Sequence, residues 1–286
     1  MDKLQEKIRK LKNPSIVDLS MFSQELPPHI LQASDSTAQA YQTTAEALLT
    51  ALRDVVPALR FRWSNFSLQG TEWIAALYAV MQKAKELGYY VILDAPEALC
   101  SSDASLGADM LSGYPCDGYV LTAYAGSDVI KPYAVKCKEN NKDLFVVLRS
   151  ANKSAAELQD LLTGSRLVHM AAADVLYRIG ESAFSACGYS KIGGVAAATA
   201  PDGVRTLRAK YPQLFLLIDG YDYTGANAKN CSYAFDQLGH GAAACARGSI
   251  TAAWLEAQTD GTDFENLAVE AAKRMRNNLT RYTTIL

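Results

Sequence analysis

Short apolar runs recur along the chain, and the longer segments between them have the residue spacing of amphipathic helices. The runs are four or five residues long, and glycine, proline or asparagine commonly bounds them. Runs this short without clean polar alternation are typical of buried parallel strands, because helices cover both faces of such a sheet. We predict eight strands: IVDL from Ile16, ALRFR from Ala58, VILD from Val91, GYVL from Gly118, LFVVL from Leu144, GVAAA from Gly194, LFLLI from Leu214 and AAACA from Ala242.

Helices are predicted between these runs. In TEWIAALYAVMQKAKELG, which starts at Thr71, apolar side chains share one face and Gly88 supplies a C-terminal stop. That face consists of Trp73, Ile74, Leu77, Tyr78, Met81 and Ala84. Pro201 is expected at the start of a further helix, where its fixed φ fits and its missing N–H costs nothing.

Two helix starts are predicted from capping boxes, in which a hydroxyl and a carboxylate satisfy backbone N–H groups reciprocally. Ser154 with Glu157 precedes AELQDLL, and Thr262 with Glu265 precedes the last helix. We expect an N-terminal helix over 2–12 and a C-terminal helix over about 262–282.

The alternation of eight strands with helices over about 250 residues favours a (β/α)8 barrel, the TIM barrel of the α/β class. A doubly wound open sheet gives a similar alternation, and we prefer the barrel. No shift in composition and no Ser/Gly-rich linker divides the chain. A single domain over 1–286 is expected.

Composition narrows the class of protein. The chain is 49% hydrophobic and 20% charged, and 28 basic against 30 acidic residues give a net charge of −2. This balance argues against a nucleic acid or a membrane surface as partner, because both attract basic proteins. No run approaches the length of a membrane span, which is about 18 residues, and no signal peptide is recognised. We expect a cytoplasmic protein.

Cysteine and histidine spacing predicts no metal site. The six cysteines, at 100, 116, 137, 187, 231 and 245, include no C-x-x-C pair, and we expect reduced thiols. The histidines at 29, 169 and 240 have no ligand spacing to one another or to cysteine. No nucleotide-cofactor motif is present, so no cofactor is expected.

Residues just after each strand are the candidates for chemistry, because barrel enzymes react at the carboxyl ends of their strands. Loops after the last two strands commonly bind phosphate through backbone N–H groups. DGYDYTG and ARGS therefore predict a phosphate site with Gly220, Gly225 and Arg247. The complete selection is Asp18 to Met21, Arg60 to Trp63, Asp94 to Glu97, Tyr124 to Asp128, Ser150 to Asn152, Thr199, Gly220 to Gly225 and Arg247 to Ser249.

Four blocks in matching order resemble a known family. MDKLQEKIRKLKNPSIVDL, TAYAGSDVIKPY, FVVLRSANKSAAELQD and YSKIGGVAAATAPDGVRTLRAKYPQLFLLIDGYDYTGAN are similar to segments of the bacterial type 2 subfamily of orotidine 5'-phosphate decarboxylase. The resemblance covers nearly the whole chain. It implies a cofactor-free TIM barrel that forms dimers and a place in pyrimidine nucleotide biosynthesis.

The family's catalytic motif is altered in this chain. The resemblance implies D-x-K-x-x-D after the third strand, where the lysine protonates the pyrimidine and the second aspartate reaches the neighbouring subunit's site. Asp94 matches the first aspartate, whereas Pro96 replaces the lysine and Leu99 replaces the second aspartate. Proline has no titratable group and cannot act as a general acid.

Other family positions are changed as well. The resemblance assigns the lysine of the second strand to Arg60, whose guanidinium is a poor proton relay, and the first-strand aspartate to Ser20. It places Ala151 at a pyrimidine-contacting serine, between Ser150 and Asn152. The phosphate-contacting glutamine corresponds to Thr224, and the phosphate arginine is retained as Arg247.

Three functions are weighed on these grounds. The leading hypothesis is a catalytically impaired paralogue that binds a pyrimidine nucleotide or acts as a regulatory partner. The alternative is an active lyase, on orotidine 5'-phosphate or a related phosphorylated ligand, with repurposed groups at Asp94, Glu97, Arg60, Asp222 and Tyr223. The third is a partner protein: besides the expected homodimer, a heterodimer with an active decarboxylase would bring Leu99 to the partner's site and inhibit it.

Overall fold

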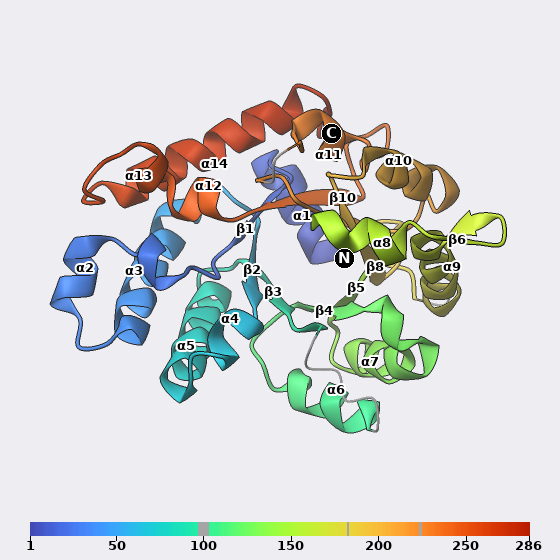
Figure 1. Cartoon of the computed structure of the whole chain (residues 1–286), viewed down its shortest axis with the longest axis horizontal. Coiled ribbons are helices and arrows are strands. Elements are labelled where there is room, and N and C mark those ends of the chain that lie inside the picture. The colour runs from blue at the N-terminus through green and yellow to red at the C-terminus, as the bar shows by residue number, and fades with distance from the viewer. Residues whose placement is uncertain (97–102, 182, 223–224) are drawn as a thin grey trace.

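A closed barrel of eight parallel strands forms the centre of the protein (Figure 1). The computed structural model describes residues 1–96, 103–181, 183–222 and 225–286. In spatial order the strands are β1-β10-β9-β8-β5-β4-β3-β2. Their bounds are β1 Ser15–Asp18, β2 Ala58–Arg62, β3 Tyr90–Asp94, β4 Gly118–Thr122, β5 Asp143–Val147, β8 Ile192–Ala197, β9 Leu216–Asp219 and β10 Ala242–Ala246.

The predicted strands and the predicted barrel are confirmed. Each of the eight apolar runs falls on one of these strands. Ile16 of β1 pairs with Cys245 of β10, which closes the sheet and rules out the doubly wound alternative. Strands of a closed barrel have no free edge, so every strand is covered by neighbours and by helices.

Helices surround the barrel on its outer face (Figure 1). Their bounds are α1 Asp2–Leu11, α2 Pro28–Ala33, α3 Thr37–Leu52, α4 Ser64–Ser67, α5 Thr71–Glu86, α6 Ala104–Ser112, α7 Ser127–Glu139, α8 Ala156–Gln159, α9 Val168–Gly180, α10 Pro201–Lys210, α11 Ala228–Ser232, α12 Gly248–Thr251, α13 Ala253–Glu256 and α14 Phe264–Thr280. Short 3-10 turns lie at Ser23–Glu25 (η1), Ala123–Ala125 (η3) and Lys153–Ala155 (η4). None of the described helices is long and apolar enough to cross a membrane.

Two separate apolar layers stabilise this arrangement. Side chains that point into the barrel, such as Ile92, Phe145 and Phe215, pack with Met1 and with Leu4 of α1. The first helix thus closes the amino end of the barrel. A larger layer fills the space between the barrel and the outer helices. Burial on both faces explains why the strand sequences are continuous apolar runs.

The predicted helix ends differ from the structure in places. The helix expected over 2–12 ends at Leu11, because Lys12 is left-handed with φ 46°, and the last helix is shorter than expected by two residues at each end. Pro201 does begin α10, as predicted. Tyr78 is exposed rather than on the buried face of α5, where Ala76 and Val80 pack instead.

Both predicted capping boxes are wrong. Ser154 lies inside a 3-10 turn, and AELQDLL forms only one short helix, α8, before an antiparallel hairpin of β6 Leu162–Thr163 and β7 Arg166–Leu167. Gly164 takes φ 65° in that hairpin, so the chain turns where helix was expected. Thr262 donates its hydroxyl to Asp260 and does not cap α14, which starts after Asp263.

Candidate functional site

A cavity of about 720 Å³ lies at the carboxyl ends of the barrel strands. Four of the predicted substrate or phosphate residues line it: Ser150, Asn152, Gly220 and Arg247. Gly225 does not line it, and Thr224 lies outside the described residues. The cavity falls within the range of small-molecule sites, roughly 300–1,000 Å³.

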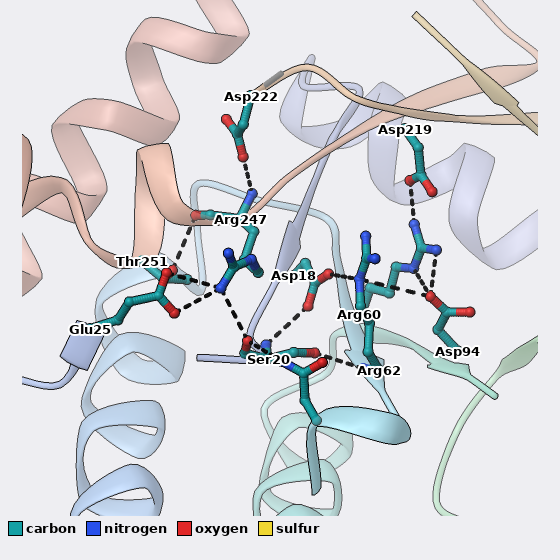
Figure 2. A network of polar contacts seen from close by, with 11 residues as sticks. Asp18, Ser20, Glu25, Arg60, Arg62, Asp94, Asp219, Asp222, Arg247 and Thr251 are labelled. Atoms are coloured by element: carbon teal, nitrogen blue, oxygen red, sulfur yellow. Dashed lines mark hydrogen bonds and ion pairs between the residues drawn. The ribbon is translucent and has the colours of Figure 1, made fainter. Parts of the chain in front are cut away.

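Arg60 lies between two carboxylates, Asp94 and Asp219, of which Asp219 lines this cavity (Figure 2). Its Nε and Nη2 donate to one oxygen of Asp94 at 2.9 and 2.5 Å, and its Nη1 pairs with Asp219. Arg60 is 2% exposed and Asp94 is 5% exposed. Burial alone would lower the pKa of Arg60, but the charges of Asp219 and Asp94 raise it well above its ordinary value. The guanidinium therefore stays charged and keeps its proton.

Asp94 is only half satisfied by this pairing. Its Oδ2 accepts both bonds from Arg60, while its buried Oδ1 has no hydrogen-bond partner in the described structure. Burial raises the pKa of the Asp94 carboxyl, and the guanidinium groups of Arg60 and Arg62 oppose that shift without cancelling it.

A second pair, Asp18 and Arg62, joins the ends of β1 and β2. Arg62 Nε donates to Asp18 Oδ2 at 2.6 Å, and the Asp18 Oδ1 accepts the backbone N–H of Ser20 at 3.0 Å. Ser20 in turn accepts the backbone N–H of Arg62 through its hydroxyl at 2.7 Å. Burial raises the pKa of Asp18, but the positive charges of Arg62 and Arg60 have the larger, opposite effect. The pKa of Asp18 therefore lies below its usual range.

The sequence indicated only some of these paired residues as candidates for the site. Asp18 and Arg62 belong to the ranges selected at strand ends, but the resemblance directed attention to Ser20 and Arg60. Arg62 lines the cavity, whereas Arg60 does not. Asp219 begins the quoted DGYDYTG segment but was not selected as a candidate, although it is the last residue of β9 and immediately precedes a selected range. The strand-end rule, moved back by one residue, would have found it.

Arg247, the expected phosphate residue, already has a carboxylate partner (Figure 2). Its Nη1 lies 2.9 and 2.7 Å from the two carboxylate oxygens of Glu25, in η1. The ring of Phe22 lies 4.8 Å from the guanidinium carbon. The backbone N–H of Arg247 donates to Asp222 at 2.5 Å, and the Ser249 hydroxyl donates to the same carboxylate. Glu25 was not among the candidates, because it precedes the arginine by more than 200 residues.

Ser150 and Asn152 differ in their availability to a ligand. The backbone N–H of Ser150 donates to Gln159 Oε1 at 2.8 Å, and the two side chains also hydrogen-bond to each other. Asn152 is exposed and lines the cavity. Of these two candidates, Asn152 is thus the one whose side chain is exposed at the cavity.

The chemistry available at the cavity is limited by these side chains. Its basic lining residues in the described structure are Arg62 and Arg247, and no lysine is among them. Arginine holds its proton at neutral pH and is a poor general acid. Within the described ranges, no three His, Cys, Asp or Glu residues are placed to hold a metal ion. The described cysteines are all unpaired thiols.

Curated relatives of the chain share one name at low sequence identity. No family model matches the chain. An orotidine 5'-phosphate decarboxylase of Rhodopirellula baltica is 27% identical over 216 residues, which cover 73% of this chain and 72% of that protein. An enzyme of the same name from Clostridium novyi is 24% identical over 284 residues and 98% of both chains.

Solved structures show the same fold at lower identity. A putative orotidine-monophosphate-decarboxylase from Toxoplasma gondii superposes with a TM-score of 0.79 at 20% identity and covers 98% of both chains. One from Plasmodium yoelii gives a TM-score of 0.81 at 12% identity and also covers 98% of both chains. The chain therefore has the (β/α)8 fold of these proteins over its full length.

Proposed function

We propose that this chain is a catalytically impaired paralogue of orotidine 5'-phosphate decarboxylase that acts as a ligand-binding or regulatory partner in pyrimidine nucleotide biosynthesis. The names of its relatives support the family and the pathway. The cavity at the carboxyl ends of the strands supports retention of a small-molecule site.

One observation carries the proposed loss of catalysis: each arginine at this site is held by carboxylates. Arg60 pairs with Asp94 and Asp219, and Arg62 pairs with Asp18. Arg247 pairs with Glu25. A proton donor must give up its proton in the transition state, and a paired guanidinium is among the least able groups to do so.

The position of the missing lysine agrees with this proposal. Pro96 lies two residues after Asp94, where the resemblance implies the proton donor. No lysine from elsewhere in the described chain lines the cavity in its place. Glu97 and Leu99, two further positions of interest, lie outside the described residues.

The test is a decarboxylation assay on protein purified from a host that lacks its own orotidine 5'-phosphate decarboxylase. We expect no turnover above the uncatalysed background. An ordinary enzymatic rate, with kcat of about 1 s⁻¹ or higher, would overturn the proposal. Asp94→Asn is assayed alongside, because turnover that this substitution leaves unchanged does not depend on the Asp94 carboxylate.

A second candidate, an active lyase on a phosphorylated ligand, is favoured by Asp94 alone. A buried carboxyl with a raised pKa and a free oxygen is a common feature of general acids and bases. The same assay distinguishes the two functions: turnover that Asp94→Asn abolishes in a folded protein supports the lyase.

We also propose that the chain forms a homodimer, with a heterodimer with an active decarboxylase as the regulatory form. The resemblance supports this, since such enzymes pair with their barrel mouths near the interface. If the heterodimer forms, mixing this protein with the active enzyme lowers its activity after subunits exchange. Unchanged activity after exchange would remove the regulatory part of the proposal.

A further inference from the structure

Two carboxylates of the chain itself occupy the groups expected to bind phosphate. A phosphate at this end of a barrel is held by backbone N–H groups after the last strands and by a cation. Here the N–H of Arg247 donates to Asp222, and the guanidinium of Arg247 pairs with both oxygens of Glu25. Figure 2 shows the two carboxylates approaching Arg247 from different sides. One contact of each kind, a backbone N–H and a guanidinium nitrogen, is thus already made within the chain.

Glu25 is fixed in this position by contacts other than Arg247. The backbone N–H of Phe22 donates to its Oε2 at 2.7 Å, and Trp254 Nε1 donates to its backbone carbonyl at 3.1 Å. Glu25 is 8% exposed. A phosphate that took over Arg247 would leave this carboxylate buried without its cation, which is strongly unfavourable.

The rest of the cavity wall also disfavours an anion. Four acidic residues of the described chain, Asp18, Asp219, Asp222 and Glu256, line it, against the two arginines 62 and 247. A nucleotide phosphate carries up to two negative charges near neutral pH and would lie beside Glu25 and Asp222. Like charges this close, in a partly enclosed site, repel strongly.

We infer that Glu25, supported by Asp222, excludes phosphate from this cavity, so that its ligand is a phosphate-free pyrimidine compound, a nucleoside or a free base. The inference rests on the proposed function for the pyrimidine class, and on the two carboxylates for the exclusion of phosphate. Glu25 is on this view a specificity residue: it contributes the negative charge that a nucleotide would otherwise bring.

Calorimetric titration of wild-type protein and Glu25→Gln with uridine and with uridine 5'-phosphate tests the inference. The amide keeps the size of Glu25 and an oxygen for the Phe22 N–H, but removes the charge that neutralises Arg247. We expect wild-type protein to bind uridine 5'-phosphate no more tightly than uridine. In Glu25→Gln we expect affinity for uridine 5'-phosphate to rise about tenfold or more, with uridine changed less than about threefold.

Glu256→Gln is the matched control. It removes one negative charge from the cavity wall, but Glu256 makes no ion pair with Arg247 in the described structure. We expect it to change affinity for uridine 5'-phosphate by less than about threefold, because exposed charges are screened by salt. If Glu25→Gln does not fold, Asp222→Asn replaces it, because Asp222 is exposed. The same rise in affinity for uridine 5'-phosphate relative to uridine is then expected.

The inference is overturned if wild-type protein prefers uridine 5'-phosphate by about tenfold or more. It is also overturned if the variant gains nothing, gains equally for both ligands, or gains no more than Glu256→Gln. These outcomes leave the proposed loss of catalysis intact, because that proposal fails only on turnover. Tight nucleotide binding without decarboxylation would therefore reject the inference alone.

Discussion

Arg60 shows how a single side chain determines the centre of this barrel. It is almost completely buried and contacts carboxylates from two other strands, Asp94 of β3 and Asp219 of β9. Burying a charge is unfavourable unless partners compensate for the lost water. The three groups therefore depend on one another, and removing the central cation takes the nearest positive charge from the buried Asp94 and from the partly buried Asp219.

We predict that Arg60→Met lowers the free energy of unfolding by about 3–5 kcal/mol, because both carboxylates lose the cation that they share. Urea denaturation followed by circular dichroism measures the change. Lys83→Met is the control, since Lys83 and Glu86 form an exposed pair on α5 at 3.8 Å. That pair is expected to contribute roughly 0.5 kcal/mol or less. Equal losses in both variants would contradict a structural role for the Arg60 network.

At the scale of elements, Asp117 connects three parts of the chain. It lies just before β4 and accepts from Lys3 of α1 at 2.8 Å and Lys85 of α5 at 2.5 Å. It also accepts the backbone N–H of Val91 in β3 at 2.8 Å. Burial raises the pKa of Asp117, but these three hydrogen bonds together have the larger, opposite effect. The pKa of Asp117 therefore lies below its usual range.

This lowered pKa predicts a pH dependence. A carboxyl with a folded pKa below its unfolded value stabilises the protein fully above the unfolded pKa, about 4, and loses that effect as the pH falls through the folded pKa. We predict that Asp117→Asn costs about 1–3 kcal/mol at pH 7. The difference from wild type should shrink as the pH falls below about 4.

Thermal unfolding of both proteins between pH 7 and pH 2 measures this difference. Asp109→Asn is the control, because Asp109 makes an exposed pair with Lys136 at 2.9 Å. It should change stability by less than about 1 kcal/mol at any pH. A difference for Asp117→Asn that stays constant with pH would show that its carboxylate charge does not matter.

The whole molecule brings together residues that are far apart in the chain. Closure of β1 against β10 places Glu25, from the first βα connection, beside Arg247, from the last. The parallel direction of all eight strands puts every carboxyl end on the same rim. The cavity and its charges are therefore a consequence of barrel closure, which no local segment contains.

The predicted homodimer is a property of the whole molecule. The chain has a mass of 31.0 kDa, so light scattering on a sizing column should give about twice that value. The measurement should be repeated over about a hundredfold range of concentration, because association follows mass action. A mass of one chain throughout that range would contradict the prediction. The outcome also bears on the heterodimer, which requires the same pairing surface.

The sequence by itself determined the fold, because each strand is recognisable from a short segment of the chain. Runs such as VILD and AAACA are apolar on both faces, and this continuous pattern specifies buried parallel strands wherever they lie. The resemblance also places Pro96 where the family has its lysine, and proline has no proton to give. Local hydrogen bonds were less predictable: the hydroxyls of Ser154 and Thr262 have the spacing of capping boxes, but neither forms one.

Only the tertiary structure decided which charges of the site are paired. Arg247 has the sequence context of a phosphate ligand, yet Glu25 and Asp222 take its contacts. The resemblance assigns Arg60 to a catalytic position, whereas the structure pairs it with Asp94 and Asp219. Electrostatic pairing depends on distance in space, and barrel closure brings together carboxylates and guanidinium groups that are separated by up to 222 residues in the chain.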